Sequence, residues 1–222
     1  MLQVSKAAMP AEFDTLVIIP GLRAIAEMIG KETAGKRYAR TAGRRHATIS
    51  AQPSAIPSDR FPPYWRSAIP LLMTAYNEIS GYTCFRIHPV TGAASADHFV
   101  AKSTNWRKVY TWSNYRLCCA RMNSRKNDFT DVLDPFDVLV DSFQLELLAF
   151  QVKPNPLLVD DDKLKVNDSI RRLGLNEFCS QREEDAEAYW AGDLSLSVLK
   201  RESPFVAYEL HRQGRLNEGD VW

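Results

Sequence analysis

The stretch Ala94-Ser95-Ala96-Asp97-His98-Phe99-Val100 decides the predicted fold, because it is a candidate strand that carries two chemically active side chains. The preceding residues 82–88 are aromatic and β-branched enough for a second strand, and Pro89-Val90-Thr91-Gly92 is typical of a turn. We therefore predict a β-hairpin that pairs residues 82–88 with residues 94–100.

Two asparagines follow this hairpin. Residues 102–112 are predicted to form a polar loop, and residues 118–126 are compatible with a short helix. Asn114 lies just after the loop, in Trp112-Ser113-Asn114-Tyr115-Arg116-Leu117, and Asn123 falls inside the helix. A strand, loop and helix in this order can bring an acid, an imidazole and a carboxamide onto one phosphate.

These side chains suit phosphodiester hydrolysis, which needs a base, a cation and a rigid frame. His98 suits the base, since an unperturbed imidazole has a pKa of about 6.5. Asp97 and Asn123 offer hard oxygen ligands for Mg²⁺ or Mn²⁺. Neighbours on a strand point to opposite faces, so Asp97 and His98 can act together only if the strand ends or bends there.

The order Asp97-His98, Asn114 and Asn123 resembles the HNH, or ββα-metal, family of endonucleases. The stretch from Asp97 to Lys126 is similar to the HNH proteins that accompany ATPases in Septu-type and retron-linked antiphage systems. The likeness covers about residues 63–182, but only the central 40 or so residues carry the specific motif. It implies that His98 is the general base, that Asp97 and Asn123 bind the metal, and that Asn114 braces the loop carrying His98.

Relatives in this family often carry a structural zinc on two Cys-x-x-Cys pairs. The corresponding residues here are Gly81-Tyr82-Thr83-Cys84 and Cys119-Ala120-Arg121-Met122, so each pair has lost one cysteine. Two thiolates cannot complete a tetrahedral zinc site. We expect no structural zinc, with Cys84, Cys119 and Met122 packed as apolar residues.

The charge pattern indicates a polyanionic partner, although the formal net charge of the chain is only +1. Between His98 and Asn127 there is no acidic residue, and the cations expected to contact nucleic acid are Lys102, Arg107, Lys108, Arg116, Arg121, Arg125 and Lys126. Four aromatic residues interleave with them and are expected to pack on sugars or bases, namely Trp106, Tyr110, Trp112 and Tyr115. We favour DNA over RNA, although these residues do not themselves separate the two.

The chain as a whole is predicted to be an α+β protein with an HNH core and flanking helices. We divide it into an N-terminal extension and basic linker (1–60), the nuclease core (61–152) and a C-terminal helical region (153–222). The first part holds an apolar segment that we expect to be a short helix broken near Pro20, and a basic run from Lys36 to His46. Helices are predicted at residues 65–79, 164–173, 183–190 and 198–212, with a weaker strand pattern over residues 143–152.

Other functional classes fit poorly. No apolar run approaches the roughly 20 residues of a membrane helix, and the first residues lack the order of a signal peptide. The four cysteines suggest no disulfide framework, so we expect a cytoplasmic protein with no membrane partner. Ser95 and Ser113 have no credible triad partners, which argues against a serine hydrolase.

The leading hypothesis is therefore a metal-dependent endonuclease that is the effector subunit of an antiphage complex with an ATPase. The alternative is a catalytically silent HNH-fold subunit that binds nucleic acid or acts as a scaffold, which the eroded cysteine pairs motivate. A free-standing toxin nuclease is a third, weaker hypothesis.

Overall fold

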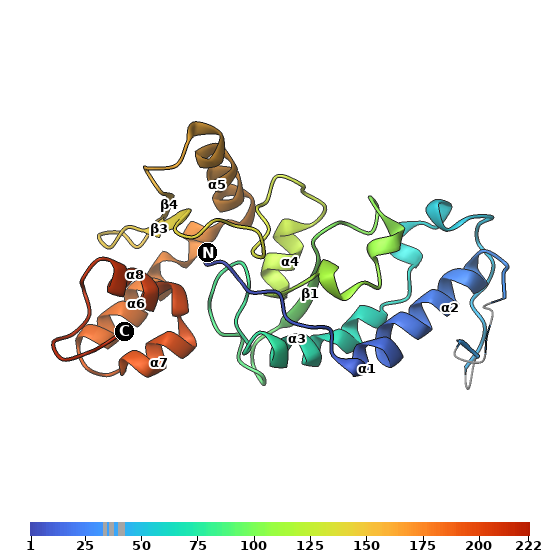
Figure 1. Ribbon diagram of the computed structural model, residues 1–222, viewed down its shortest axis with the longest axis horizontal. Coiled ribbons are helices and arrows are strands. Elements are labelled where there is room, and N and C mark those ends of the chain that lie inside the picture. The colour runs from blue at the N-terminus through green and yellow to red at the C-terminus, as the bar shows by residue number, and fades with distance from the viewer. Residues whose placement is uncertain (33–34, 36–37, 40–42) are drawn as a thin grey trace.

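The computed structural model describes residues 1–32, 35, 38–39 and 43–222 of the chain. It is a mixed helical and stranded structure with two small antiparallel sheets. Figure 1 shows an elongated molecule in which the N-terminal helix and the C-terminal helices lie at opposite ends, with the first sheet between them. The expected basic run from Lys36 to His46 lies partly outside the described residues.

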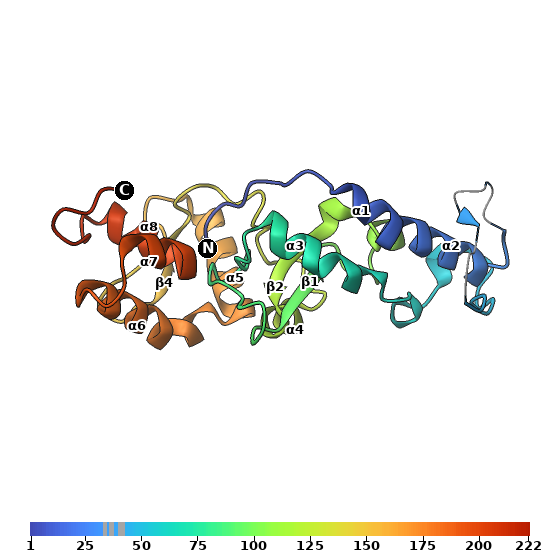
Figure 2. The same ribbon diagram turned by 90° about the horizontal axis from the view of Figure 1, so that it is seen from below.

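The first sheet is a hairpin of β1 (Ala94–His98) and β2 (Tyr115–Cys119), and α4 (Ala120–Lys126) follows β2 directly. The antiparallel register runs from Ala94 opposite Cys119 to His98 opposite Tyr115. Figure 2 shows β1, β2 and α4 together at the middle of the molecule. A β-β-α unit is therefore present, with the short helix at the expected position.

The predicted pairing of residues 82–88 with residues 94–100 is wrong. The backbone reverses at Cys84, which has a φ of 56°, and only an isolated bridge between Ile79 and Arg86 forms there. The N–H of Arg86 donates instead to the carbonyl of Glu202 at 2.9 Å. These local bonds remove residues 82–88 from the sheet, so β1 pairs across the longer loop with β2.

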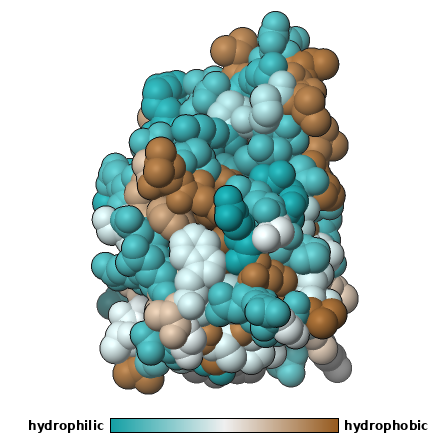
Figure 3. All heavy atoms as spheres, turned by 90° about the vertical axis from the view of Figure 1, so that its left-hand side faces the viewer, coloured by the Kyte–Doolittle hydropathy of each residue, from teal (hydrophilic) through white to brown (hydrophobic). Residues whose placement is uncertain are grey.

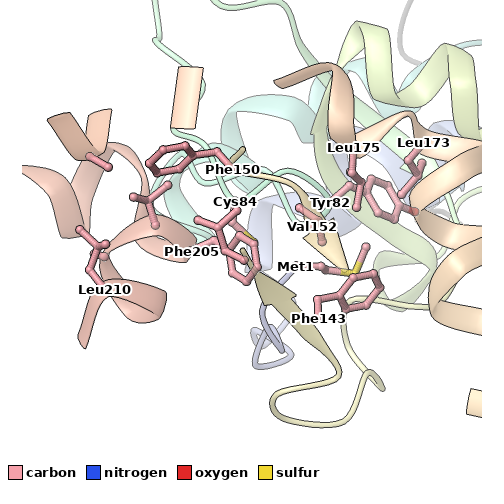
Figure 4. Packing of buried hydrophobic residues seen from close by; sticks show 14 of the residues in the cluster. Met1, Tyr82, Cys84, Phe143, Phe150, Val152, Leu173, Leu175, Phe205 and Leu210 are labelled. Carbon is pink, nitrogen blue, oxygen red and sulfur yellow. The ribbon is translucent and has the colours of Figure 1, made fainter. Parts of the chain in front are cut away.

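The hairpin is buried on both faces, and each face has its own hydrophobic cluster. Ala96 and Leu117 belong to a cluster that includes residues of the N-terminal helix and of α3 (Ile69–Ala75). Cys118 faces the other cluster, which Tyr82 joins and which extends to the C-terminal helices, as Figure 4 shows. Because strand neighbours point to opposite faces, β2 contributes to both clusters, whereas β1 contributes Ala94 and Ala96 to the first cluster and carries the polar Ser95 and Asp97 on its other face.

The N-terminal helix is packed, contrary to the expectation of an extension without a core. It comprises α1 (Ala11–Phe13), a π-helical turn (Asp14–Ile18) and α2 (Ile19–Met28). Pro20 does not break it: the N–H of Ile19 reaches back to the carbonyl of Asp14, and this wider turn leads into the proline that lacks a donor. Phe13 is fully buried and meets the rings of Trp112 and Tyr115 edge-on.

The C-terminal part begins with the second sheet, in which β3 (Phe143–Leu145) pairs with β4 (Val152–Pro154). Two of the predicted helices are longer than expected, as α5 (Asp160–Leu173) and α6 (Cys179–Trp190). The predicted helix over residues 198–212 is divided into α7 (Leu196–Glu202) and α8 (Pro204–Arg212), because Pro204 can begin a helix but cannot continue one.

Short 3-10 helices connect these elements, at Pro53–Ala55, Ser58–Arg60, Tyr64–Ala68, Trp106–Lys108, Trp112–Asn114 and Leu175–Phe178. The predicted helix over residues 65–79 is therefore a 3-10 helix followed by the shorter α3. Over the described part of the chain, no helix combines the length and the apolar character that crossing a bilayer requires.

If the N-terminal helix is part of the core, Phe13→Ala should lower the free energy of unfolding by about 3–5 kcal/mol, because it leaves a cavity against two rings. Urea denaturation measures this directly. Leu16→Ala is the matched control, since Leu16 lies in the same helix but is 44% exposed, and we expect a change within about 0.5 kcal/mol. Equal effects of the two substitutions would contradict the packing described.

Candidate functional site

A pocket of about 470 Å³ opens around the end of β1 and is lined by Asp97, His98 and Asn123. Other side chains at its wall include Ser58, Trp65, Ser95, Lys102, Ser103 and Ser124. The structure therefore brings together three of the four residues expected to do the chemistry. Asn114, the fourth, lies behind the wall.

Asp97 is held from behind by two buried side chains. It is 1% exposed, the Tyr82 hydroxyl donates to its Oδ2 at 2.6 Å, and Lys126 Nζ lies 4.0 Å from the same oxygen. Burial raises the pKa of Asp97, and the Lys126 ammonium and the Tyr82 hydrogen bond oppose that rise. Oδ2 is thus occupied by Tyr82, and among the described residues no side chain or backbone group donates to Oδ1.

His98 is the last residue of β1, and its ring lies edge-on to Trp65 and Tyr115, each at 5.0 Å between ring centroids. Its Nε2 is 2.9 Å from the carbonyl oxygen of Val109. A carbonyl only accepts, so Nε2 carries the proton and Nδ1 of the neutral ring carries a lone pair. Burial lowers the pKa of His98 to about 4, which keeps the ring neutral at pH 7.

Asp97 and His98 are neighbours on a strand and point to opposite faces, so they can reach one pocket only where the strand ends. The pocket lies at that end of β1. β1 ends at His98, and the next N–H, of Phe99, donates to the carbonyl of Asn114 at 2.9 Å. Asp97 faces α4 and His98 faces Trp65, yet both line the pocket. Asp97 and His98 can therefore both face the pocket although they are adjacent in the sequence.

Asn114 closes the loop that carries the His98 acceptor. Its Oδ1 accepts from the N–H of Val100 at 2.8 Å, and its Nδ2 donates to the carbonyls of Val100 and Lys108, each at 3.0 Å. Three bonds from one carboxamide join the two sides of the loop, next to Val109. This geometry suits a brace for the loop and places no Asn114 atom in the pocket.

Asn123 lies on α4 on the same side of β1 as Asp97. Its Nδ2 donates to Ser95 Oγ at 2.7 Å, and Ser95 and Asp97 are alternate residues of the strand and share a face. The Asn123 carboxamide oxygen is then left for a ligand in the pocket.

The oxygen donors of the pocket are of the chemical kind that a hard cation binds. Asp97, Asn123 and Ser95 supply a carboxylate, a carboxamide oxygen and a hydroxyl, and Mg²⁺ commonly takes one or two carboxylates and completes its shell with water and phosphate oxygens. No group of three or more His, Cys, Asp or Glu side chains in the described ranges is close enough to hold a metal. These oxygens are therefore suited to Mg²⁺ or Mn²⁺ only as part of a coordination shell that other ligands complete.

Two of the residues expected to bind nucleic acid are buried, and that expectation is corrected. Arg116 forms a two-pronged ion pair with Asp134 and packs against the ring of Phe136. Lys126 donates to the carbonyl of Phe99 at 2.8 Å and lies 3.4 Å from that of His98, which joins α4 to the end of β1. Lys126 therefore fixes α4 to the strand end beside the pocket, whereas Arg116 belongs to the packing around Asp134 and Phe136.

The remaining cations differ in their availability. Arg121 and Arg125 both pair with Glu177, and Arg125 also donates to the carbonyl of Leu173. Lys102 is partly buried over the ring of Trp65, and burial lowers its pKa. Arg107 and Lys108 are exposed. Lys102 therefore lines the pocket itself, and Arg107 and Lys108 are exposed further along the same loop.

Most of the aromatic side chains expected to contact nucleic acid are also buried. Trp112 and Tyr76 stack in the core, Tyr115 donates to the carbonyl of Val109, and Tyr110 donates to that of Pro62. Trp106 is the partly exposed member of the group. The interleaving of basic and aromatic residues reflects a packed loop more than a binding surface.

Three site residues were not predicted from the sequence: Tyr82, Trp65 and Ser95. Tyr82 comes from a predicted strand, and no spacing signals that its hydroxyl reaches a carboxylate 15 residues later. Trp65 was assigned to a helix core, and it does pack in a cluster while also lining the pocket. Ser95 was considered only as a nucleophile, whereas it accepts from Asn123.

The residues that correspond to the zinc-binding positions of the resembled family lie in the apolar cluster that Tyr82 joins. Cys84 and Met122 are buried there, and Cys119 packs against its edge. These side chains are packed as the sequence predicted. The four cysteines are free thiols.

The buried His98 makes stability depend on pH. The unfolded chain takes up a proton near pH 6.5 that the folded chain resists down to about pH 4, so the free energy of unfolding should fall by about 3 kcal/mol as the pH falls through this window. His98→Gln, which keeps a donor for Val109, should lose this contribution. Urea denaturation of the wild type and of His98→Gln at several pH values measures the difference. Asp97 is present in both proteins, so its own contribution to the pH dependence of stability cancels. Parallel pH profiles would contradict the buried neutral ring.

Comparison with known proteins identifies no relative of this chain, so the site is interpreted from its own residues alone. The chain matches no protein-family model, no curated protein and no solved structure.

Proposed function

We propose that this protein is a metal-dependent endonuclease of the HNH type that hydrolyses nucleic-acid phosphodiesters. One observation carries the proposal: His98, with Nε2 held by the Val109 carbonyl and Nδ1 left with a lone pair, shares a pocket with the oxygens of Asp97 and Asn123. The order of β1, β2 and α4 supports the assignment to the ββα-metal class. The resemblance in the motif supports it independently.

In the proposed mechanism, His98 Nδ1 accepts a proton from a water molecule that attacks the phosphorus. The low pKa of the ring in the empty pocket rises when a phosphate anion lies beside it, because the anion stabilises the imidazolium. Val109 and Asn114 keep the ring and its loop fixed while the proton is held. Asp97 and Asn123 would hold a divalent cation, which would neutralise charge on the phosphate and on the leaving oxygen.

The substrate is proposed to be DNA rather than RNA, approached over Lys102, Arg107 and Lys108. Lys102 lines the pocket together with Asp128, and Arg107 and Lys108 are exposed on the same loop between β1 and β2, with no acidic residue between these three cations in the sequence. The wider setting, an effector subunit beside an ATPase in antiphage defence, rests on the sequence resemblance. A cytoplasmic location agrees with the free thiols.

A catalytically silent binding or scaffolding subunit is the second candidate. It is favoured by the donor set: Asp97 and Asp128 are the carboxylates at the wall of the pocket, and no three His, Cys, Asp or Glu side chains come together among the described residues, so metal affinity without substrate is expected to be weak. The two candidates differ in turnover, and the following experiments separate them.

The purified chain with Mg²⁺ or Mn²⁺ should cleave at least one of double-stranded DNA, single-stranded DNA and RNA. We expect His98→Ala to reduce the rate by about 10²–10⁴-fold, because the general base is lost. His88→Ala is the matched control and should retain the rate, since His88 Nδ1 only accepts from the N–H groups of Val90 and Thr91 in a turn. Equal cleavage by wild type and His98→Ala would refute the catalytic assignment.

Cleavage should stop when the divalent ion is removed with a chelator and return when Mg²⁺ is added. Asn123→Ala should raise the Mg²⁺ concentration for half-maximal rate about tenfold or more, because the cation loses an oxygen ligand. Ser124→Ala, on the same helix and the same pocket wall, should not. If the two variants respond identically to Mg²⁺, Asn123 is not a metal ligand.

A further inference from the structure

Trp65 lines the pocket around Asp97 and His98, and the proposed mechanism gives it no role. It is half-buried, its ring lies edge-on to that of His98, and it stacks on Tyr110 with 6.4 Å between ring centroids. Lys102 Nζ lies over the same ring, 4.2 Å from its centroid. Trp65 is therefore a fixed aromatic ring beside the proposed reaction centre, with the end of one flexible side chain resting on it.

A nucleobase can take the place of Lys102 on this ring. An ammonium and a flat base both bind to the face of an indole, the first by cation–π attraction and the second by stacking. A phosphate in the pocket would attract the Lys102 ammonium more strongly than the ring does, because a full negative charge outweighs a ring quadrupole. One bound nucleotide would thus draw Lys102 onto its phosphate and free the face of Trp65 for its base.

The depth of the pocket favours a single strand. Asp97 is 1% exposed and His98 9%, so the scissile phosphate has to enter the pocket to reach them. The phosphates of a duplex are fixed along two stiff backbones, and its bases are stacked on one another inside. An unpaired strand can insert one phosphate and turn the neighbouring base onto an aromatic ring at the same time.

The charge of the pocket also disfavours a duplex. Among the described residues that line it, Lys102 is the one Lys or Arg, whereas Asp97 and Asp128 are carboxylates. Most of the other cations predicted for this region are buried or paired with Glu177. A duplex carries about twice the phosphate charge of a single strand per unit length, so it would be repelled more by the carboxylates and compensated less by the cations.

The C-terminal end of the molecule does not extend the pocket into a polar track. In Figure 3, which looks onto that end, brown apolar side chains interrupt the teal ones across the face. A duplex bound along its length needs several phosphate contacts in a row. The surface in this view is therefore poorly suited to carry a duplex away from the pocket.

We propose that the substrate is unpaired at the scissile phosphate and that Trp65 binds the neighbouring nucleobase by stacking, in exchange for Lys102. The inference rests on the proposed nuclease function and deepens it by naming the substrate class. Ser58 and Ser103 also line the pocket, and their hydroxyls can donate to or accept from any base edge, so we expect all four bases to be accepted. The unpaired base is common to DNA and RNA strands, and the experiment includes both.

Oligonucleotide binding to the wild-type chain tests the substrate class without any substitution. One mixed sequence is presented as single-stranded DNA, as single-stranded RNA and as a blunt DNA duplex, and fluorescence anisotropy gives the affinities with Ca²⁺ in place of Mg²⁺. Gel electrophoresis confirms that the strands stay intact. We expect at least one of the single strands to bind at least tenfold more tightly than the duplex.

An abasic residue moved along the preferred strand then tests the role of Trp65. At one position it should weaken binding to the wild type about five- to a hundredfold, because one stacked base is lost. Trp65→Leu should weaken binding of the intact strand by a similar factor and make it insensitive to the abasic residue at that position. Trp65→Phe keeps a ring and should restore most of the sensitivity.

Trp106→Leu is the matched control. Trp106 is also half-buried and lies under a cation, Arg107, at 4.7 Å, but it lines a different pocket. This variant should keep the full sensitivity to the abasic residue. Thermal midpoints report the folding of each variant, and each comparison of intact and abasic strands is made within one protein, so a general loss of affinity does not imitate the expected result.

Three results would overturn the inference: equal affinity for strand and duplex, no sensitive abasic position in the wild type, or the same sensitivity in Trp65→Leu. The first two need no variant, so they decide even if Trp65→Leu does not fold. Binding of a single strand that depends on Trp65, without any cleavage in Mg²⁺ or Mn²⁺, would count against the proposed function alone. Cleavage of strand and duplex at equal rates would count against the inference alone, so the two failures are distinguishable.

Discussion

The structure depends on one constraint: a hairpin of only two strands cannot be stable in water by itself, so β1 and β2 need cover on both faces. The chain supplies that cover from its two ends. The N-terminal helix and α3 cover the face with Ala96 and Leu117, and the C-terminal region reaches the face with Cys118. The hairpin is therefore the boundary between two hydrophobic clusters, and the pocket is located where that boundary ends.

The polar groups of the site occupy this boundary and are almost all partnered by buried groups. Tyr82 and Lys126 hold Asp97, Val109 holds His98, and Asn114 holds the loop between the strands. Water cannot screen or replace these contacts, so the positions of the side chains are set before any ligand arrives. The same burial raises the pKa of Asp97 and lowers that of His98, which leaves both groups sensitive to charge that enters the pocket.

Sequence reasoning located the local elements better than the long-range contacts. The position of α4 and the three C-terminal helical regions followed from periodicity, and Asp97, His98 and Asn123 meet as their order suggested. The strand pairing was wrong because the turn at residues 89–92 is a strong local signal, whereas pairing of β1 with β2 depends on tertiary contacts that local sequence does not encode. Arg116 and Lys126 looked like surface cations because charge counts carry no information on burial, and Tyr82 reaches Asp97 only through the fold.

The double cover of the hairpin has a consequence for synthesis on the ribosome. Phe13 packs on Tyr115, while Phe205 and Leu210 belong to the cluster on the opposite face, so contacts that support the pocket span nearly the whole chain. Contacts so distant in sequence form late, after loop-closure entropy has been overcome. We expect a nascent chain that ends before α8 to lack a settled pocket, so that any catalytic capacity appears only after α8 has been synthesised.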